Sequence, residues 1–374
     1  MSRPRLLSGI QPSGRLHLGN YLGALKNFVD LQNSDKYECY FFIADLHSLT
    51  EEFNPEEKAK QILELTADYL AAGLDPKKSV IFQQSQIPAH SELAFILNTI
   101  TPMGELERMT QFKDKAGMSK NYAEARKILE NARLDFKPGT PVKTDDFIKK
   151  LNESIEYFDK AKEARENTNA GLFTYPILMA ADIILYDAKF VPTGDDQDQH
   201  LELTRALVRK FNSKFGKVFT EPQGLHTEIP RVMSLGDPSK KMSKSKPETC
   251  LFLDDSPEVI ESKIKRAVTD SGNEVKFNPE TKPAISNLLK IYSSLSDKNT
   301  EKLEKEFSGK TYSELKSSLA KLAITYFADY RKNKKSLLAK PSTLSTTLTQ
   351  GSKKAGKIAD KKILEVKKRT GLTL

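Results

Sequence analysis

The sequence predicts an α/β protein, with a parallel sheet near the N-terminus followed by a helical C-terminal region. Within residues 1–90, three short apolar runs alternate with segments whose apolar residues recur at helical spacing. Strands that alternate with helices form parallel sheets through right-handed crossovers. After Ser256, by contrast, the patterned segments have the period of a helix.

The expected strands are the apolar runs Leu6–Ile10, Tyr40–Ala44 and Ser79–Gln83. Apolar residues between Tyr21 and Leu31 predict a helix after the first strand. A second helix is expected to begin at Asn54, a good N-cap, and to end near Gly73. Ligands of such sheets bind beyond the carboxyl ends of the strands, where the loop after Ile10 should lie.

The remainder of the chain is expected to be mainly helical. Further helical segments are expected within 105–167 and at 195–211, 259–268, 285–295, 312–330 and 351–368. The segment 237–247 is rich in Pro, Ser and Lys, which is typical of a loop. The segment 341–350, rich in Ser and Thr, is expected to be a linker.

The composition of the chain indicates which kind of partner the protein binds and in which cellular compartment it is expected. The net charge is +9, and from Arg331 to Leu374 only Asp360 and Glu365 oppose the lysines and arginines. This excess favours an anionic partner such as nucleic acid; a solvated basic face is the alternative. The two cysteines form no C-x-x-C pair, and no apolar run is long enough to span a bilayer. The N-terminus lacks the apolar core of a signal peptide, so we expect a cytoplasmic protein without membrane contact.

The segment Gln11–Asn20 has the composition of a nucleotide-binding turn. Gly14 and Gly19 lie between a strand and a helix, where glycine allows the backbone to approach a ligand closely. The amino end of the following helix attracts anions, and His17 and Asn20 can donate hydrogen bonds to phosphate oxygens. The alternative is an ordinary strand-to-helix turn with a surface histidine.

A second segment, Lys240–Lys246, reads K-K-M-S-K-S-K. Lysine is a mobile point charge suited to a triphosphate whose charge is redistributed during a reaction. Small serines allow such a loop to close over a nucleotide. Taken alone, the segment is equally compatible with a solvated basic loop.

Together, H-L-G-N and K-M-S-K-S resemble the paired motifs of class I aminoacyl-tRNA synthetases, in the required order. Longer stretches resemble bacterial-type tryptophanyl-tRNA synthetases, namely G-I-Q-P-S-G-R-L-H-L-G-N, G-E-L-E-R-M-T-Q-F-K-D-K, A-G-L-F-T-Y-P-I-L-M-A-A-D and V-P-T-G-D-D-Q-D-Q-H. The resemblance covers nearly the whole chain apart from one insertion. It implies a Rossmann-like catalytic domain, a homodimer with 104–115 near its interface, and tryptophan, ATP with Mg²⁺ and the tRNA for tryptophan as substrates.

The resemblance also implies the roles of individual residues. The ATP site would comprise Gln11, Pro12, Ser13, Gly19, Asn20, Gly194, Asp195, Asp196, Val232, Lys241, Met242, Ser243, Lys244 and Ser245. His17, Asn20, Lys241 and Lys244 would stabilise the transition state. The tryptophan site would comprise Tyr175, Met179, Asp182 and Gln197, with Asp182 accepting the indole N–H.

The residue pattern around Asp182 agrees with that role. A carboxylate within an otherwise apolar helix needs a hydrogen-bond donor. If the indole N–H is that donor, an analogue without it is discriminated against by up to ~10⁴-fold. The alternative is a structural carboxylate that is bonded to nearby backbone or hydroxyl groups.

The resemblance divides the chain into a catalytic domain (1–240), a mobile loop (241–250), an anticodon-recognition domain (251–335) and a linker with a basic helix (336–374). The insertion, about 118–166, is expected to form two helices around 122–133 and 145–162, separated by the turn 137–140. Leu7 stands where the family often has phenylalanine. With two cysteines, neither an iron–sulfur cluster nor another protein-bound metal is expected.

Three other functions stay open at this stage. A tyrosyl-type synthetase differs in its second motif and its substrate motif. A small-molecule nucleotidyltransferase shares the first loop, but it predicts neither Lys241 and Lys244 nor the helical C-terminal region. A non-catalytic RNA-binding paralogue has no need of His17 and both lysines.

Overall fold

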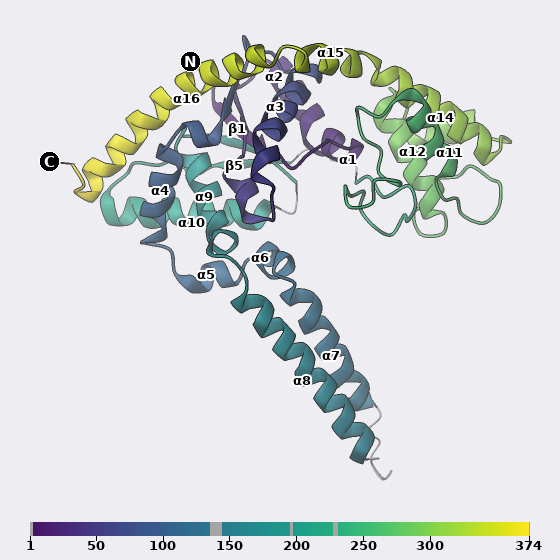
Figure 1. Cartoon of the computed structure of the whole chain (residues 1–374), viewed down its shortest axis with the longest axis horizontal. Helices are drawn as coiled ribbons and strands as arrows, with labels where there is room; N and C mark the ends of the chain where they lie inside the picture. The colour runs from purple at the N-terminus through teal and green to yellow at the C-terminus, as the bar shows by residue number, and fades with distance from the viewer. Residues whose placement is uncertain (1–2, 135–143, 195–196, 227–230, 374) are drawn as a thin grey trace.

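The computed structural model describes residues 3–134, 144–194, 197–226 and 231–373. Figure 1 shows a body built around a sheet, a group of C-terminal helices beside it, and a long helical hairpin that projects from the body. The expected turn at 137–140 lies outside the described residues, as do Asp195 and Asp196. Within the described ranges, no helix is both long and apolar enough to cross a membrane.

The sheet has five parallel strands in the order β3-β2-β1-β4-β5, which confirms the predicted parallel sheet. The strands are β1 (Arg5–Ile10), β2 (Glu38–Ile43), β3 (Val80–Gln83), β4 (Phe190–Thr193) and β5 (Gln223–His226). The first three match the expected runs. Alternate residues point to opposite faces, so Leu6 and Leu7 lie in different hydrophobic clusters.

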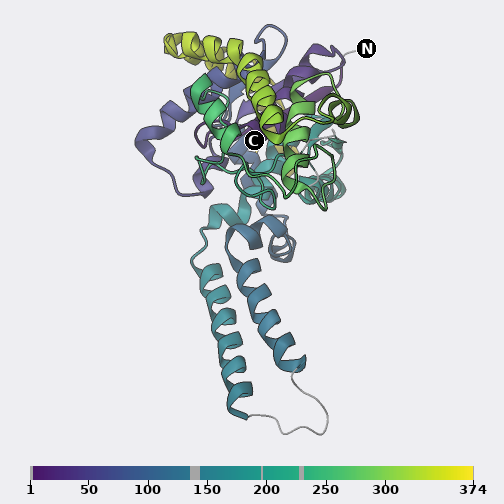
Figure 2. The same ribbon diagram turned by 90° about the vertical axis from the view of Figure 1, so that its right-hand side faces the viewer.

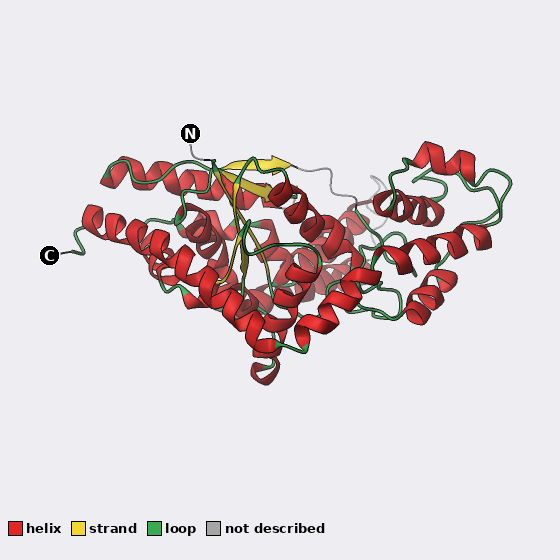
Figure 3. Cartoon of the chain, turned by 90° about the horizontal axis from the view of Figure 1, so that it is seen from above, coloured by secondary structure: helices red, strands yellow, loops and turns green. Residues whose placement is uncertain are grey.

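Helices cover both faces of this sheet (Figure 3). The helices up to the hairpin are α1 (Leu18–Asn20), η1 (Tyr21–Leu25), α2 (Lys26–Asn33), η2 (His47–Thr50), α3 (Pro55–Ala71), η3 (Gln84–Gln86), α4 (Ala89–Asn98), α5 (Met103–Glu107) and α6 (Thr110–Lys115). Phe28 of α2 and Tyr69 of α3 pack on one face, in the cluster that contains Leu6. The opposite face carries α4, α9 (Ala170–Ile184) and α10 (Asp198–Phe215).

The insertion forms the projecting hairpin, as the sequence predicts. Its two antiparallel helices are α7 (Met118–Leu134) and α8 (Thr144–Glu166). Figure 2 shows them side by side and extending away from the rest of the chain.

The C-terminal helices are α11 (Pro257–Arg266), α12 (Pro283–Leu295), α13 (Thr300–Glu306), α14 (Tyr312–Tyr326) and α15 (Ala328–Leu338). The single helix expected at 312–330 is broken at Phe327, where the backbone leaves the helical conformation (φ −94°, ψ 11°). The break buries the Phe327 ring, whose centroid lies 5.2 Å from that of Tyr21 in an edge-on contact. Burial of this ring offsets the loss of helix continuity.

The prediction of a linker at 341–350 is wrong, because this segment is the first part of a continuous helix, α16 (Pro341–Thr370). Leu344 and Leu348, four residues apart, are buried and hold the Ser/Thr-rich turns against the body. The helix packs against β3, an edge strand of the sheet. The Ser352 hydroxyl accepts a hydrogen bond from the Gln83 backbone N–H at 3.2 Å, so α16 covers a strand edge that would otherwise be open.

Candidate active site

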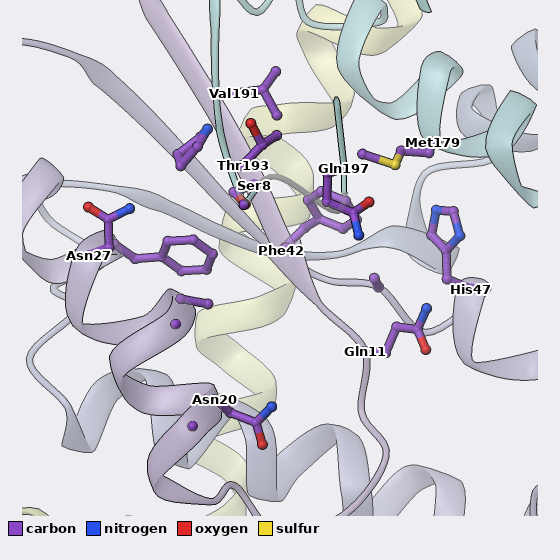
Figure 4. A pocket seen from close by; sticks show the side chains of 18 of the residues that line it. Ser8, Gln11, Asn20, Asn27, Phe42, His47, Met179, Val191, Thr193 and Gln197 are labelled. Atoms are coloured by element: carbon purple, nitrogen blue, oxygen red, sulfur yellow. The ribbon is translucent and has the colours of Figure 1, made fainter. Parts of the chain in front are cut away.

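A deep cavity of about 1230 Å³ lies at the carboxyl ends of the strands. Typical small-ligand pockets have ~300–1,000 Å³, so this cavity can hold more than one small molecule. In Figure 4, Asn20 and Asn27 lie on one side, and His47 and Met179 lie on another. The expected site residues that line it are Gln11, His17, Gly19, Asn20, Tyr175, Met179, Asp182, Gly194, Gln197, Val232, Lys241 and Met242.

The remaining expected residues that the structure describes lie on the two loops beside this cavity. They are Pro12 and Ser13 on the loop after β1, and Ser243, Lys244 and Ser245 on the lysine-rich loop. Among the described residues, no group of three or more His, Cys, Asp or Glu side chains is arranged to hold a metal ion.

The loop after β1 ends in a reciprocal cap that orients His17. The His17 ring accepts a hydrogen bond from the Asn20 backbone N–H through Nδ1 (3.3 Å), and Asn20 Oδ1 accepts one from the His17 N–H (3.3 Å). Because Nδ1 is the acceptor, the neutral ring carries its proton on Nε2 and can donate from there. A Cβ on Gly19 would lie 2.9 Å from the His17 ring, so only glycine leaves room for this arrangement.

The ring is held in its neutral form. Burial, with a smaller contribution from the nearby Lys244 charge, lowers the pKa of His17 to about 4. A neutral imidazole at physiological pH offers a hydrogen bond to an anion without adding a full charge.

This pKa predicts a pH dependence of stability. Since the pKa of His17 is lower in the folded than in the unfolded chain, the unfolded chain binds more protons between about pH 6.5 and 4. Stability should therefore fall as the pH falls through that window, by about 2–3 kcal/mol for this group at pH 4.5. His17→Asn retains an N-capping oxygen but does not titrate. Urea unfolding should show a smaller loss between pH 7 and 4.5 in the variant; equal losses would contradict the assignment.

The lysine-rich loop is anchored by Met242 and carries two lysines toward the site. Met242 is buried, and its backbone N–H donates to the Val232 carbonyl at 3.1 Å. Lys241 lines the cavity. Lys244 donates from Nζ to the Ser13 carbonyl (3.3 Å), the Ser13 hydroxyl (3.1 Å) and the Gly14 carbonyl (3.2 Å), while burial lowers its pKa. These three partners are neutral oxygens, so an incoming phosphate would be a stronger partner for the ammonium group.

Asp182 is buried at the wall of the cavity and has three side-chain donors. Gln84 Nε2 lies 2.9 Å from both carboxylate oxygens, His47 Nε2 lies 2.8 Å from Oδ2, and His90 Nδ1 lies 2.6 Å from Oδ1. Burial alone would raise the pKa of the Asp182 carboxyl, but the hydrogen bonds from His47 and His90 hold it below its usual value. His90 Nε2 lies 2.7 Å from the Tyr186 hydroxyl, which can donate to it.

Sequence reasoning missed the partners of Asp182. His47 and Gln84 follow the ends of β2 and β3, and His90 lies in α4. The parallel topology brings the ends of these strands together, so polar residues directly after expected strands are the signal that could have found them. Arg231 and Thr193 also line the cavity and were not expected there.

The side of the cavity next to His47 contains a second polar group, which is centred on Tyr175. Tyr175 donates its hydroxyl to Gln111 Oε1 at 2.9 Å and lies 2.9 Å from His200 Nε2. Met179 and Gln197 line the same cavity, and Leu7 also contributes to its wall.

Comparisons with known proteins show the family to which the chain belongs. The family model for class I tRNA synthetases (W and Y) matches residues 1–134 and 148–328. The tryptophan–tRNA ligase of Bacillus anthracis is 41% identical over 374 residues, covering 98% of both chains. The chain belongs to the bacterial-type tryptophanyl-tRNA synthetases. Within this family, the relative from Caldanaerobacter subterraneus is 40% identical over 373 residues and covers 99% of both chains.

Solved structures of tryptophanyl-tRNA synthetases have the same fold. That from Mycoplasma pneumoniae superposes with a TM-score of 0.78 at 33% identity, covering 100% of this chain and 99% of the other. That from Campylobacter jejuni, complexed with ADP and tryptophan, gives a TM-score of 0.74 at 32% identity and covers 98% and 99%.

Proposed function

We propose that the chain is a tryptophan–tRNA ligase that works in two steps within this cavity. The carboxylate of L-tryptophan attacks the α-phosphate of ATP, giving tryptophanyl-adenylate and pyrophosphate. The tryptophanyl group then passes to the terminal ribose of its tRNA in the cytoplasm. The observation that carries this proposal is one continuous cavity with the nucleotide loop and Lys241 at one side and the buried Asp182 carboxylate at another.

At the nucleotide end, catalysis consists of positioning and charge stabilisation rather than covalent chemistry. His17, Asn20, Lys241 and Lys244 are the groups that contact the triphosphate as negative charge moves toward the departing pyrophosphate. Mg²⁺ enters as part of the ATP substrate. The proposed ATP contacts besides these four are Gln11, Pro12, Ser13, Gly19, Gly194, Asp195, Asp196, Val232, Met242, Ser243 and Ser245.

At the amino-acid end, Tyr175 and Gln197 hold the α-amino group, Met179 packs against the ring, and Asp182 accepts the indole N–H. Four contacts already occupy the lone pairs of the carboxylate. His47 is the donor that lies at the cavity wall with Asp182. The indole N–H therefore replaces the His47 hydrogen bond when tryptophan binds.

This exchange of hydrogen-bond donors changes how strongly the enzyme is expected to discriminate against an analogue of tryptophan that lacks the indole N–H. The benzothiophene analogue of tryptophan, with sulfur in place of N–H, leaves His47 paired with Asp182 instead of leaving the carboxylate unpaired. The loss in kcat/KM for adenylate formation should therefore stay below about 100-fold, the value of one charged hydrogen bond, because the analogue keeps the His47 bond that tryptophan replaces. Pyrophosphate exchange with both substrates measures the ratio, and a loss near ~10⁴-fold would contradict the replacement of His47.

The anticodon of the tRNA is proposed to contact the helical region 251–335. The basic charge of the last residues and the net charge of +9 support an RNA partner. The enzyme is proposed to act as a homodimer with residues 104–115 near its interface.

The test is exchange of labelled pyrophosphate into ATP with each of the twenty amino acids. Tryptophan should drive exchange far more efficiently than any other. Exchange driven by tyrosine would support the tyrosyl-type alternative, and exchange with none would favour an RNA-binding paralogue. Because the chain contains no tryptophan residue, the fluorescence of bound tryptophan can also be followed without protein indole background.

A further inference from the structure

The hairpin of α7 and α8 is held together by small residues. Ala125, Ala132 and Ala161 are buried between the helices, and the buried Ser154 donates from its hydroxyl to the Ala125 carbonyl at 3.3 Å. Small residues at a seam let two helices approach closely. The larger apolar side chains of the hairpin therefore lie outside the seam.

These larger side chains form one face, which we call the arm face. Tyr122 and Phe158 lie on the same side of the hairpin, with ring centroids 6.0 Å apart. Leu129 follows Tyr122 by seven residues, and Leu151 precedes Phe158 by seven, so the helical period keeps all four on that side. The exposed fractions of the face's side chains are 37–48%. Its members are Tyr122, Leu129, Ile148, Leu151, Ile155 and Phe158.

Nothing in the described chain covers this face. Figures 1 and 2 show the hairpin extending away from the body, and its contacts with the rest are near its root, at α6 and at the Arg165–Glu107 ion pair. The positions 148, 151, 155 and 158 have the 3-4-3 spacing by which helices pack against other helices. A contiguous apolar face of this kind indicates an interaction site.

The charges of the hairpin indicate that a protein, rather than RNA, packs against the arm face. The residues of α7 and α8 carry nine basic and nine acidic side chains, so these two helices, which we call the arm, are together neutral although the chain carries +9. RNA binding requires an excess of Lys and Arg to neutralise phosphates.

The charges at the two edges of the arm face are opposite in sign. Arg126 and Arg133 follow Tyr122 and Leu129 by four residues and border the face on α7. On α8, Asp159 follows Ile155 by four residues and Asp145 precedes Ile148 by three, while Lys162 at the root is paired with Glu166. A second arm related by a twofold axis parallel to the helices would place its α7 over this α8, and its basic edge along this acidic edge.

We infer that the arm faces of two copies of this chain pack together as a four-helix bundle. The inference rests on the homodimer in the proposed function, because α7 begins directly after 104–115, the segment assigned to the dimer interface. The six side chains expose on the order of 500 Å² per arm. Two arms then bury about 1,000 Å², which is at the lower limit of a specific interface. The arms therefore reinforce a dimer whose bodies also touch.

The test compares two double variants of the full chain by analytical ultracentrifugation. Leu151→Gln with Ile155→Gln makes the arm face polar, at positions that are already exposed in the single chain. Lys149→Gln with Glu153→Gln is the matched control, at exposed positions of α8 outside the arm face and with no change in net charge. The first should raise the dimer dissociation constant at least tenfold; the second should change it less than twofold.

Equal dissociation constants for the two variants would overturn the inference and leave the homodimer intact. A wild-type chain that stays monomeric would overturn both, whereas pyrophosphate exchange tests the proposed activity separately. Weaker tRNA binding with an unchanged dimer would assign the face to RNA and also overturn the inference. Circular dichroism checks that the variants keep their helices.

The relative orientation of the two arms is tested separately, by disulfide cross-linking. Leu129→Cys and Leu151→Cys are placed on two differently tagged copies that are co-expressed. These positions lie at the same height on the two helices, because Ala125 is next to Ser154, so oxidation should link the two tags. Cys39 and Cys250 are buried and should give little background. If oxidation instead links only pairs of copies that both carry Leu151→Cys, the arrangement of α7 over α8 is overturned.

Discussion

Replacing Lys244 with alanine should slow adenylate formation by about 10²–10³-fold, the cost of removing one preorganised charge contact in a transition state. Lys244 donates to three neutral oxygens of the loop after β1 and is partly buried, and this burial lowers its pKa. A partly buried ammonium whose partners are neutral oxygens gains most when the negative charge of the departing pyrophosphate appears beside it. Pyrophosphate exchange measures the rate, and the fluorescence of bound tryptophan measures substrate binding, which should be unchanged.

Lys246→Ala is the matched control. Lys246 lies in the same loop with an exposed side chain, so its loss should change the exchange rate less than threefold. Similar rates for Lys244→Ala and the wild type would remove Lys244 from the reaction. They would also favour the non-catalytic alternative.

Replacing Gly351 with alanine should destabilise the fold by about 3 kcal/mol or more. A Cβ at this position would lie 1.7 Å from the Ile81 carbonyl oxygen and 2.6 Å from its carbon. Both atoms belong to the backbone of β3, so α16 would have to move away from the strand. That movement would open the packing of Leu348 and Ala355, which are buried on the same helix.

Gly356 provides the control within the same helix. A Cβ there meets nothing within 4 Å, so Gly356→Ala should raise the free energy of unfolding by about 0.5–1 kcal/mol. Urea unfolding measures both variants. If Gly351→Ala cannot be purified folded while Gly356→Ala can, the close contact is supported; equal stabilities would contradict it.

The strands and the two loops could be predicted because local signals specify them. Apolar runs such as Tyr40–Ala44, and the glycines of the loop after Ile10, determine their structure over a few residues. The two helices of the hairpin were predicted for the same reason, since the sequence of each has a regular helical period.

Features that depend on distant residues could not be predicted in this way. The segment 341–350 has the composition of a linker, and only burial of Leu344 and Leu348 against the body makes it a helix. The break at Phe327 depends on the Tyr21 ring, which is distant in sequence. Asp182 was identified from the family resemblance, with which its apolar surroundings agree. Its donors lie in η2, η3 and α4, and only the folded sheet brings them together.

The most direct test of the central claim is aminoacylation of purified tRNAs for tryptophan and for tyrosine, each with both amino acids. The enzyme should attach tryptophan to the tryptophan tRNA, with negligible product in the three other combinations. Attachment of tyrosine, or formation of tryptophanyl-adenylate without transfer to either tRNA, would contradict the assignment as a tryptophan–tRNA ligase.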